Sequence, residues 1–112
     1  MLEVSFRRDS LNRLSSVFAF GHIEIPETSS DEYSLVCAAV SAILQAARLG
    51  LEAHVKLPLD VTQKPGELAV RWPYSARDDQ RVTAIIETAH LAVKQIASQY
   101  PNHVRLSEEA EP

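Results

Sequence analysis

The side chains that could do nucleophilic chemistry are one cysteine, Cys37, and four histidines. A single cysteine excludes an intrachain disulfide and zinc sites that need several cysteines. None of the histidines is spaced with another histidine or with an acid in a metal-binding motif, and three separated glycines form no phosphate-binding loop. We therefore expect no metal and no cofactor. The chemistry left open is attack by a thiolate with a histidine as its base.

The position of Cys37 in a predicted helix decides whether the thiol is reactive. Residues 35–49 are expected to form this helix, with Ser34 as N-cap and Gly50 at the C-terminus. Cys37 would then lie in the first turn, where free amides and the helix dipole favour a thiolate. Amides near Cys37 and Ala38 would be candidates for an oxyanion site. The alternative is a buried core cysteine, the commoner state of an isolated helical cysteine.

His22 is the histidine best placed to act as the base. It closes a predicted strand just before the loop that leads into the helix of Cys37. A strand end, a loop and a helix start can bring the two side chains together at one edge of a sheet. Gly21 allows close backbone approach, useful beside a bound peptide. The alternative for His22 is a strand-end histidine hydrogen-bonded to water, and the other histidines have weaker cases: a strand, the polar face of a second helix and a near-terminal loop.

The elements around these residues predict an α+β fold with ββαββα order, in which two helices pack on a mixed sheet. Alternating apolar residues, a helical apolar stripe over 82–100 and turn residues between segments support this assignment. Phe18 and Phe20 are expected to share one strand face with Leu14. The predicted segments are strands Leu2–Phe6, Leu14–His22, His54–Val61 and Glu67–Trp72, a capping box at 75–78 and a short strand Val104–Leu106.

The 112 residues are expected to form one small domain, residues 1–106, followed by an acidic disordered tail, residues 107–112. The net charge of −4 is local: segment 23–34 carries four acids and the tail three, which leaves eight acids against eleven bases. A protein with this net negative charge lacks the basic surface that direct nucleic-acid binding requires. The most apolar stretch, Leu35–Leu44, is far short of a ~20-residue membrane span, so we expect a soluble cytoplasmic protein with no membrane contact.

The predicted first helix is apolar nearly all round; its polar interior residues, Ser41, Gln45 and Arg48, form one narrow stripe. Such a helix is buried on most sides, by its own sheet and by a partner. Leu91 adds an apolar residue to the otherwise polar side of the second helix. Together these features predict a homodimer.

The pair Gly21-His22 and the run Val36-Cys37-Ala38-Ala39-Val40-Ser41-Ala42 resemble the ribosomal-processing cysteine protease (Prp) family. The pattern of that family is Gly-His-Ala, a loop, and then Asp-x-Val-Cys-Ala-Ala-x-Ser-Ala. The resemblance extends to the order of elements over essentially the whole chain. It implies a small cytoplasmic bacterial protease, homodimeric and active in ribosome biogenesis, that removes an N-terminal extension from large-subunit ribosomal protein twenty-seven.

By this resemblance Cys37 is the nucleophile, His22 the general base and Ser41 a packing or hydrogen-bonding partner. The substrate would be the basic N-terminal segment of a ribosomal protein, attracted by an acidic loop over the site. The chain departs from the family pattern at Ile23, at Ser34 in place of aspartate, and in a longer loop without glycine. Asp31 or Glu32 would then orient the histidine, or the site is a bare Cys-His dyad. The alternative function is a catalytically silent ribosome-associated or peptide-binding homologue.

Overall fold

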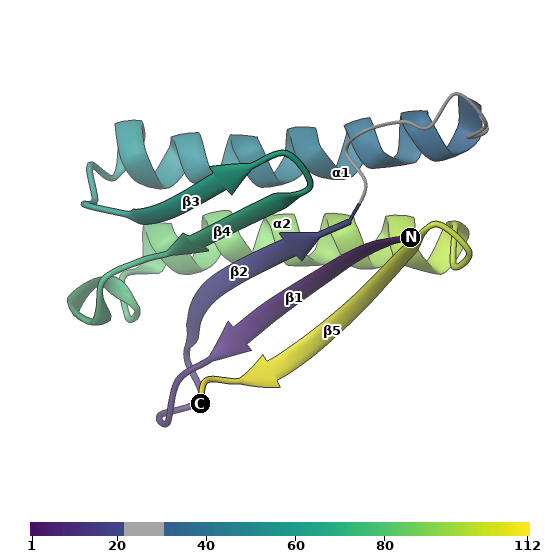
Figure 1. Cartoon of the computed structure of the whole chain (residues 1–112). Helices are drawn as coiled ribbons and strands as arrows, with labels where there is room; N and C mark the ends of the chain where they lie inside the picture. The colour runs from purple at the N-terminus through teal and green to yellow at the C-terminus, as the bar shows by residue number, and fades with distance from the viewer. Residues whose placement is uncertain (22–30) are drawn as a thin grey trace.

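The fold is a five-stranded sheet with two long helices on one side of it (Figure 1). The computed structural model describes residues 1–21 and 31–112. The strand order is β3-β4-β2-β1-β5, in which β1 and β5 are parallel and all other neighbours antiparallel. The predicted α+β class, mixed sheet and two helices are confirmed. The elements are β1 Leu2–Arg8, β2 Leu14–Phe20, α1 Asp31–Leu49, β3 Asp60–Lys64, β4 Glu67–Arg71, α2 Gln80–Gln99 and β5 Val104–Ala110.

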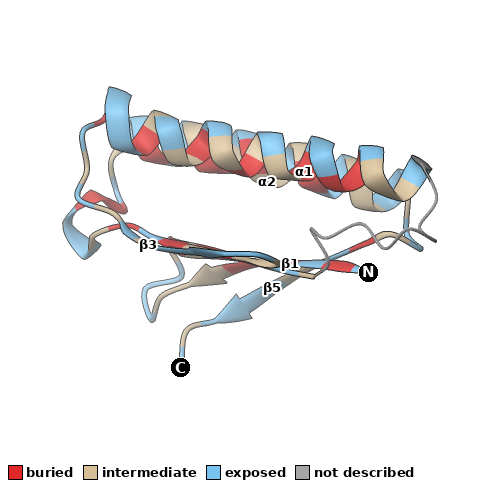
Figure 2. Ribbon diagram, turned by 45° about the horizontal axis from the view of Figure 1, so that its top comes forward, coloured by how far each residue is buried: buried red, intermediate tan, exposed pale blue. Residues whose placement is uncertain are grey.

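The core lies between the helix layer and one face of the sheet, and the opposite sheet face is uncovered by helices (Figure 2). Phe6 of β1, Val40 of α1 and Val93 of α2 are completely buried there. Trp72, just after β4, is also buried and its indole nitrogen donates a hydrogen bond to the carbonyl of Leu14 (2.9 Å). Apolar burial of this extent is the main force that holds α1 and α2 on the sheet.

The face assignment predicted for β2 is wrong beyond Leu14. Arg7 pairs with Ser16 while Arg8 pairs with Leu14, so Ser15 is an extra residue in a β-bulge. The bulge reverses the alternation of side chains, which puts Val17 into the core and leaves Phe18 half-buried and Phe20 exposed. Phe18 and Phe20 therefore stack with each other (6.3 Å between ring centroids) away from the core.

The predicted strand His54–Val61 is also wrong except at its last two residues, because β3 begins at Asp60. The chain continues from α1 through a π-helical turn, Gly50–His54, so Gly50 is not the residue that ends the helix. The helix is closed instead at Lys56, whose φ is 62°, and by a hydrogen bond from the Leu57 amide to the Leu51 carbonyl (3.0 Å). Gly50 packs closely against α2, because a Cβ there would lie 3.2 Å from the end of the Ile85 side chain.

The N-terminus of α2 is capped by Asp79 and not by the predicted box beginning at Ser75. Residues Tyr74–Ala76 form a 3-10 turn, after which the Asp79 carboxylate accepts a hydrogen bond from the Arg81 amide (2.8 Å). The Arg81 side chain and its amide, both hydrogen-bonded to this carboxylate, lower the pKa of Asp79 to about 2. The Asp79 carboxylate is therefore ionised at neutral pH, and its negative charge stabilises the N-terminal end of α2.

The acidic tail is not disordered, contrary to the sequence prediction. Residues Ser107–Ala110 belong to β5 and pair with β1 from Ser5 to Arg8. The three acids of residues 107–112 form ion pairs with arginines: Glu108 with Arg8, Glu109 with Arg7, and Glu111 with Arg71. Edge pairing with β1 and these ion pairs explain why the segment is ordered despite its charge.

Residues Glu32–His54 have a mean hydropathy of 1.6 and are, by length and composition alone, long and apolar enough to cross a membrane. This segment continues the apolar stretch Leu35–Leu44 in both directions. One side of it packs on the sheet, where Val36, Val40 and Leu44 are buried. Between Leu35 and Leu49 its exposed residues are all apolar, and this is the surface considered below for self-association.

Candidate active site

Cys37 lies six residues into α1, further along the helix than the sequence predicted. Because α1 already includes Asp31, Ser34 is inside the helix and is not its N-cap. The amides of Cys37 and Ala38 face the carbonyls of Tyr33 and Ser34, four residues earlier, as in any α-helix. These amides are therefore not free to form an oxyanion site, and the expectation that they would do so is wrong.

The thiol of Cys37 is almost completely buried, with 7% of the residue exposed. Its neighbours Val36 and Val40 on the same helix belong to the core. Tyr33 lies one helical turn before Cys37 on α1. Burial, and after it the interaction with the Cys37 side chain, raise the pKa of Tyr33 to about 12, so Tyr33 is neutral at physiological pH.

The ring of Tyr33 packs against His103, in the turn between α2 and β5. Its centroid is 5.5 Å from that of His103, which in turn is 6.4 Å from Tyr100. Nε2 of His103 is 3.0 Å from Oε2 of Glu32, next to Tyr33 in α1. The His103 carbonyl accepts a hydrogen bond from the Leu2 amide (2.9 Å), so this histidine is anchored to β1 as well. The start of α1 is therefore tied to the start of β5.

The end of β2 lies against the helical turn that follows Cys37. Ala19 of β2 and Val40 and Ser41 of α1 line one small cavity of about 30 Å³ between helix and sheet. The predicted meeting of the His22 and Cys37 side chains involves a residue outside the described ones and stays a prediction. Ser41 is half-buried and lines this cavity, and its predicted role also stays a prediction.

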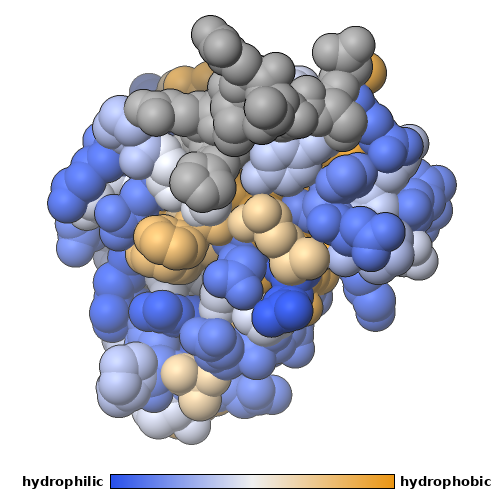
Figure 3. Space-filling model, turned by 45° about the vertical axis from the view of Figure 1, so that its right-hand side comes forward, coloured by the Kyte–Doolittle hydropathy of each residue, from blue (hydrophilic) through white to orange (hydrophobic). Residues whose placement is uncertain are grey.

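Gly21 follows β2 with a φ of +149°, a value that L residues rarely adopt. Its amide donates a hydrogen bond to the Gly66 carbonyl (3.0 Å), and a Cβ at this position would lie 2.7 Å from the Met1 carbonyl oxygen. The predicted need for glycine is therefore met within the chain itself, by close approach of three backbone segments. Figure 3 shows this end of the molecule, where a small apolar patch lies among mostly hydrophilic side chains.

The other predicted site residues differ in what the structure says of them. His22, the predicted base, lies outside the described residues, as does most of the acidic loop. Asp31 is the first residue of α1 and Ala38 is exposed on that helix. Glu32, one of the two acids expected to orient the histidine, is paired with His103.

Sequence reasoning missed two residues near the start of the cysteine helix: Tyr33, one turn before Cys37, and His103, which packs against Tyr33. Tyr33 precedes the cysteine by four residues, and this helical spacing was a signal in the sequence. His103 carried no such signal, because only the parallel pairing of β1 with β5 places it beside α1. Within residues 1–21 and 31–112 no cluster of three or more histidine, cysteine or acidic side chains could hold a metal ion.

Comparisons with known proteins give one family model that matches nearly the whole chain and several solved structures with the same fold. A family model described as cysteine protease Prp matches residues 1–105. A crystal structure of SMU.848 from Streptococcus mutans superposes with a TM-score of 0.85 at 22% identity, over 99% of each chain. A ribosomal processing protease Prp from Staphylococcus aureus, in complex with a covalently linked product peptide, gives 0.80 at 20% identity over 96% of this chain and 99% of that one. The same protease has been solved with a substrate peptide, with the same similarity. No curated protein matches the chain.

Proposed function

The chain belongs to the cysteine protease Prp family, and on that premise we propose that it removes the N-terminal extension of large-subunit ribosomal protein twenty-seven. The observation that carries the proposal is the family match over residues 1–105, which includes both Gly21-His22 and the motif around Cys37. The similar Staphylococcus aureus protein is a ribosomal processing protease and has been solved with a substrate peptide, which supports a ribosomal-protein peptide as the substrate class.

In the proposed mechanism Cys37 is the nucleophile and His22 the general acid and base. The Cys37 thiolate attacks the carbonyl carbon of the scissile peptide bond and forms a C–S bond. The C–N bond then breaks as His22 gives a proton to the leaving amine. A water molecule, deprotonated by His22, hydrolyses the resulting thioester and restores the thiolate. Burial of Cys37 keeps bulk water from the sulfur until a peptide is bound.

The position of the strand end supports this assignment of roles. Because Ala19 shares a cavity with Val40 and Ser41, β2 delivers the chain to the turn of α1 just beyond Cys37. Gly21, the last described residue before His22, is held there by its hydrogen bond to Gly66. The described chain therefore leaves β2 at an anchored glycine, the residue that precedes His22 in the sequence.

The decisive experiment is cleavage of the ribosomal-protein precursor from the same organism, followed by mass spectrometry of the products. Wild-type protein is expected to release the N-terminal extension, and Cys37→Ala to release none while it still binds the precursor. Cleavage that persists in Cys37→Ala would refute the nucleophile, and binding without cleavage by the wild type would favour the catalytically silent homologue. Ser98→Ala is the control, because it removes one Oγ atom from an exposed residue of α2, outside the site, and is expected to keep activity.

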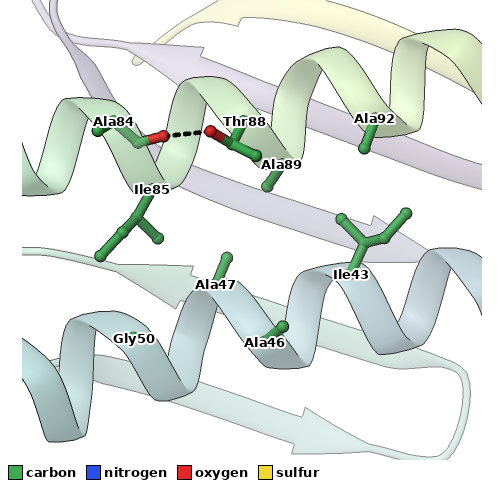
Figure 4. A pocket seen from close by; sticks show the side chains of 9 residues that line it. All are labelled: Ile43, Ala46, Ala47, Gly50, Ala84, Ile85, Thr88, Ala89 and Ala92. Carbon is green, nitrogen blue, oxygen red and sulfur yellow. Dashed lines mark hydrogen bonds between the residues drawn. The ribbon is translucent and has the colours of Figure 1, made fainter.

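We further propose that the protein is a homodimer, joined through the outer face of the two helices. Figure 4 shows the groove between α1 and α2, a cavity of about 510 Å³ lined almost entirely by apolar side chains. Its polar lining residue, Thr88, donates its hydroxyl to the Ala84 carbonyl (2.6 Å) and is thereby satisfied within α2. Leu35, Leu49 and Leu91 are exposed on the same two helices.

The outer face of α1 is suited to a second copy of the same helix pair. From Leu35 to Leu49 every exposed residue is apolar, and most of them are alanine, so two helices can approach closely. A twofold axis through such a face would cover the same apolar surface on both protomers. Coverage by a membrane is the competing explanation for so apolar a helix, and the association experiment developed in the Discussion distinguishes the two.

A further inference from the structure

The position of Cys37 depends on how the first turn of its helix is held. α1 begins at Asp31, and Cys37 lies in the second turn, where its amide pairs with the Tyr33 carbonyl. The first four amides of a helix have no carbonyl partner within it, so a helix frays from this end unless other parts of the chain hold it. Loss of the first turn would therefore remove the backbone partner of Cys37.

One side chain from outside α1 holds two consecutive residues of that first turn. Nε2 of His103 is 3.0 Å from Oε2 of Glu32. The imidazole also packs against the ring of Tyr33, with 5.5 Å between centroids. Figure 1 shows the start of α1 and the turn between α2 and β5, which carries His103, at the same end of the molecule. Because the two contacts come from neighbouring positions, together they oppose both lifting and rotation of the first turn.

His103 is itself fixed by its backbone. Its carbonyl accepts a hydrogen bond from the Leu2 amide of β1 (2.9 Å), and its amide donates one to the Tyr100 carbonyl (3.0 Å). The Tyr100 ring lies 6.4 Å from the imidazole, and only 21% of the histidine side chain is exposed. An ion pair between two mobile surface side chains contributes little, but an imidazole held in this way loses little further freedom when it binds Glu32.

We propose that His103 is a positioning residue for Cys37 and acts through the first turn of α1. The inference rests on the proposed function, in which Cys37 is the nucleophile. The role is indirect: His103 holds Glu32 and Tyr33, and the helix transmits that restraint to the cysteine one turn later. A displacement of about 1 Å can slow a reaction about a hundredfold, because the reacting atoms must meet at about 3–3.5 Å. The restraint therefore acts on the chemical step more than on peptide binding.

The test combines hydrogen–deuterium exchange of α1 with the kinetics of precursor cleavage. Exchange of the amides in residues 35–40 is followed by mass spectrometry without substrate. Glu32→Ala, at a side chain that is 62% exposed, is expected to speed this exchange about two- to fivefold. His103→Ala also removes the ring packing and is expected to speed it about tenfold. In both variants kcat should fall by a similar factor while KM stays unchanged.

Glu32→Gln is the rescue variant. A glutamine amide can donate or accept a hydrogen bond, so it can bind Nε2 of His103 in either tautomer of the ring. Its exchange and its kcat are expected to match those of the wild type. A loss in Glu32→Gln as large as that in Glu32→Ala would overturn the hydrogen bond as the source of the restraint.

Glu87→Ala is the matched control. Glu87 also pairs with a histidine, with 3.8 Å between its Oε2 and Nδ1 of His90, but both residues lie on α2. Glu87 also pairs with Arg8 at the far end of β1. Its removal is expected to leave the exchange of residues 35–40 and kcat unchanged, and a change equal to that in Glu32→Ala would overturn the role of His103.

The exchange experiment needs no substrate, so it separates this inference from the proposed function. Failure of the wild type to cleave the precursor would refute the proposed substrate, whereas faster exchange in His103→Ala would still support the restraint on α1. Unchanged exchange, or faster exchange with an unchanged kcat, would refute only the positioning role. Glu32→Ala, at an exposed residue, decides the question if His103→Ala does not fold.

Discussion

Replacing Leu49 by serine is expected to weaken self-association of the protein without unfolding it. Leu49 is the last residue of α1 and is 60% exposed. It lies one turn beyond Ala46, which lines the groove between α1 and α2. Because the exposed part of its side chain makes no contribution to the core, serine removes apolar surface that only a partner could cover.

The magnitude follows from the exposed fraction and the twofold symmetry. Complete burial of a leucine side chain stabilises a protein by about 1.5–3 kcal/mol. With 60% of the residue still exposed, coverage by a partner would add about 1–2 kcal/mol in each protomer. A twofold interface buries the residue twice, so Leu49→Ser should weaken the dimer by about 2–4 kcal/mol, or roughly 30-fold to several hundred-fold in Kd.

The assay is sedimentation velocity over a dilution series, and the matched control is Leu11→Ser. Leu11 is also 60% exposed but lies in the turn between β1 and β2, outside both helices. The control should associate like the wild type, whereas Leu49→Ser should dissociate at higher concentration. A wild-type protein that stays monomeric throughout, or equal dissociation of both variants, would refute the proposed interface. Binding of a monomeric wild type to lipid vesicles would instead support coverage of α1 by a membrane.

Two further predictions concern stability. Gly21→Ala should lower the free energy of unfolding in urea by roughly 1–3 kcal/mol, because φ is +149° and the new Cβ would lie 2.7 Å from the Met1 carbonyl oxygen. Gly50→Ala, which meets only the flexible side chain of Ile85, should have a smaller effect, and an equal loss would contradict this explanation. Asp79→Asn keeps a capping side chain but loses the charge, so at pH 7 it should unfold at a lower temperature than the wild type. Since the pKa of Asp79 falls from 3.8 to about 2 on folding, that deficit should persist above pH 3.8 and disappear as the pH falls toward 2; a deficit independent of pH would contradict the assignment.

Local patterns predicted most of the fold. Alternation over Leu2–Phe6 and the apolar stripe over 82–100 identified β1 and α2, because side-chain period depends only on backbone geometry. The bulge at Ser15 could not be predicted this way, since it depends on how β1 and β2 pair. The role of Gly50 could not be predicted from local patterns either. The chain stays helical past Gly50, and the neighbour of this glycine, Ile85, belongs to a different helix. The preference of glycine for helix ends is weak, and tertiary packing can override it.

The acidic tail shows how long-range pairing can reverse a sensible local prediction. Three acids in six residues favour disorder when they are considered alone. β2 pairs with one edge of β1, which leaves the other edge available to β5. Arg7 and Arg8 of β1 then form ion pairs with Glu109 and Glu108 of β5. The partners of these acids are about a hundred positions away in sequence, so composition of the tail itself carried no trace of them.

The sequence by itself determined the chemistry available to this protein: one thiol, a histidine after a glycine at a strand end, and the motif that assigns both to the Prp family. Residue identity and short spacing are enough for that, because they are properties of the chain alone. The tertiary structure decided the environment of the thiol. It placed Cys37 beyond the free amides of the first turn, buried it, and packed His103 against Tyr33, one helical turn before the cysteine. Those features depend on where α1 begins and on the parallel pairing of β1 with β5, which form only when distant segments pack together.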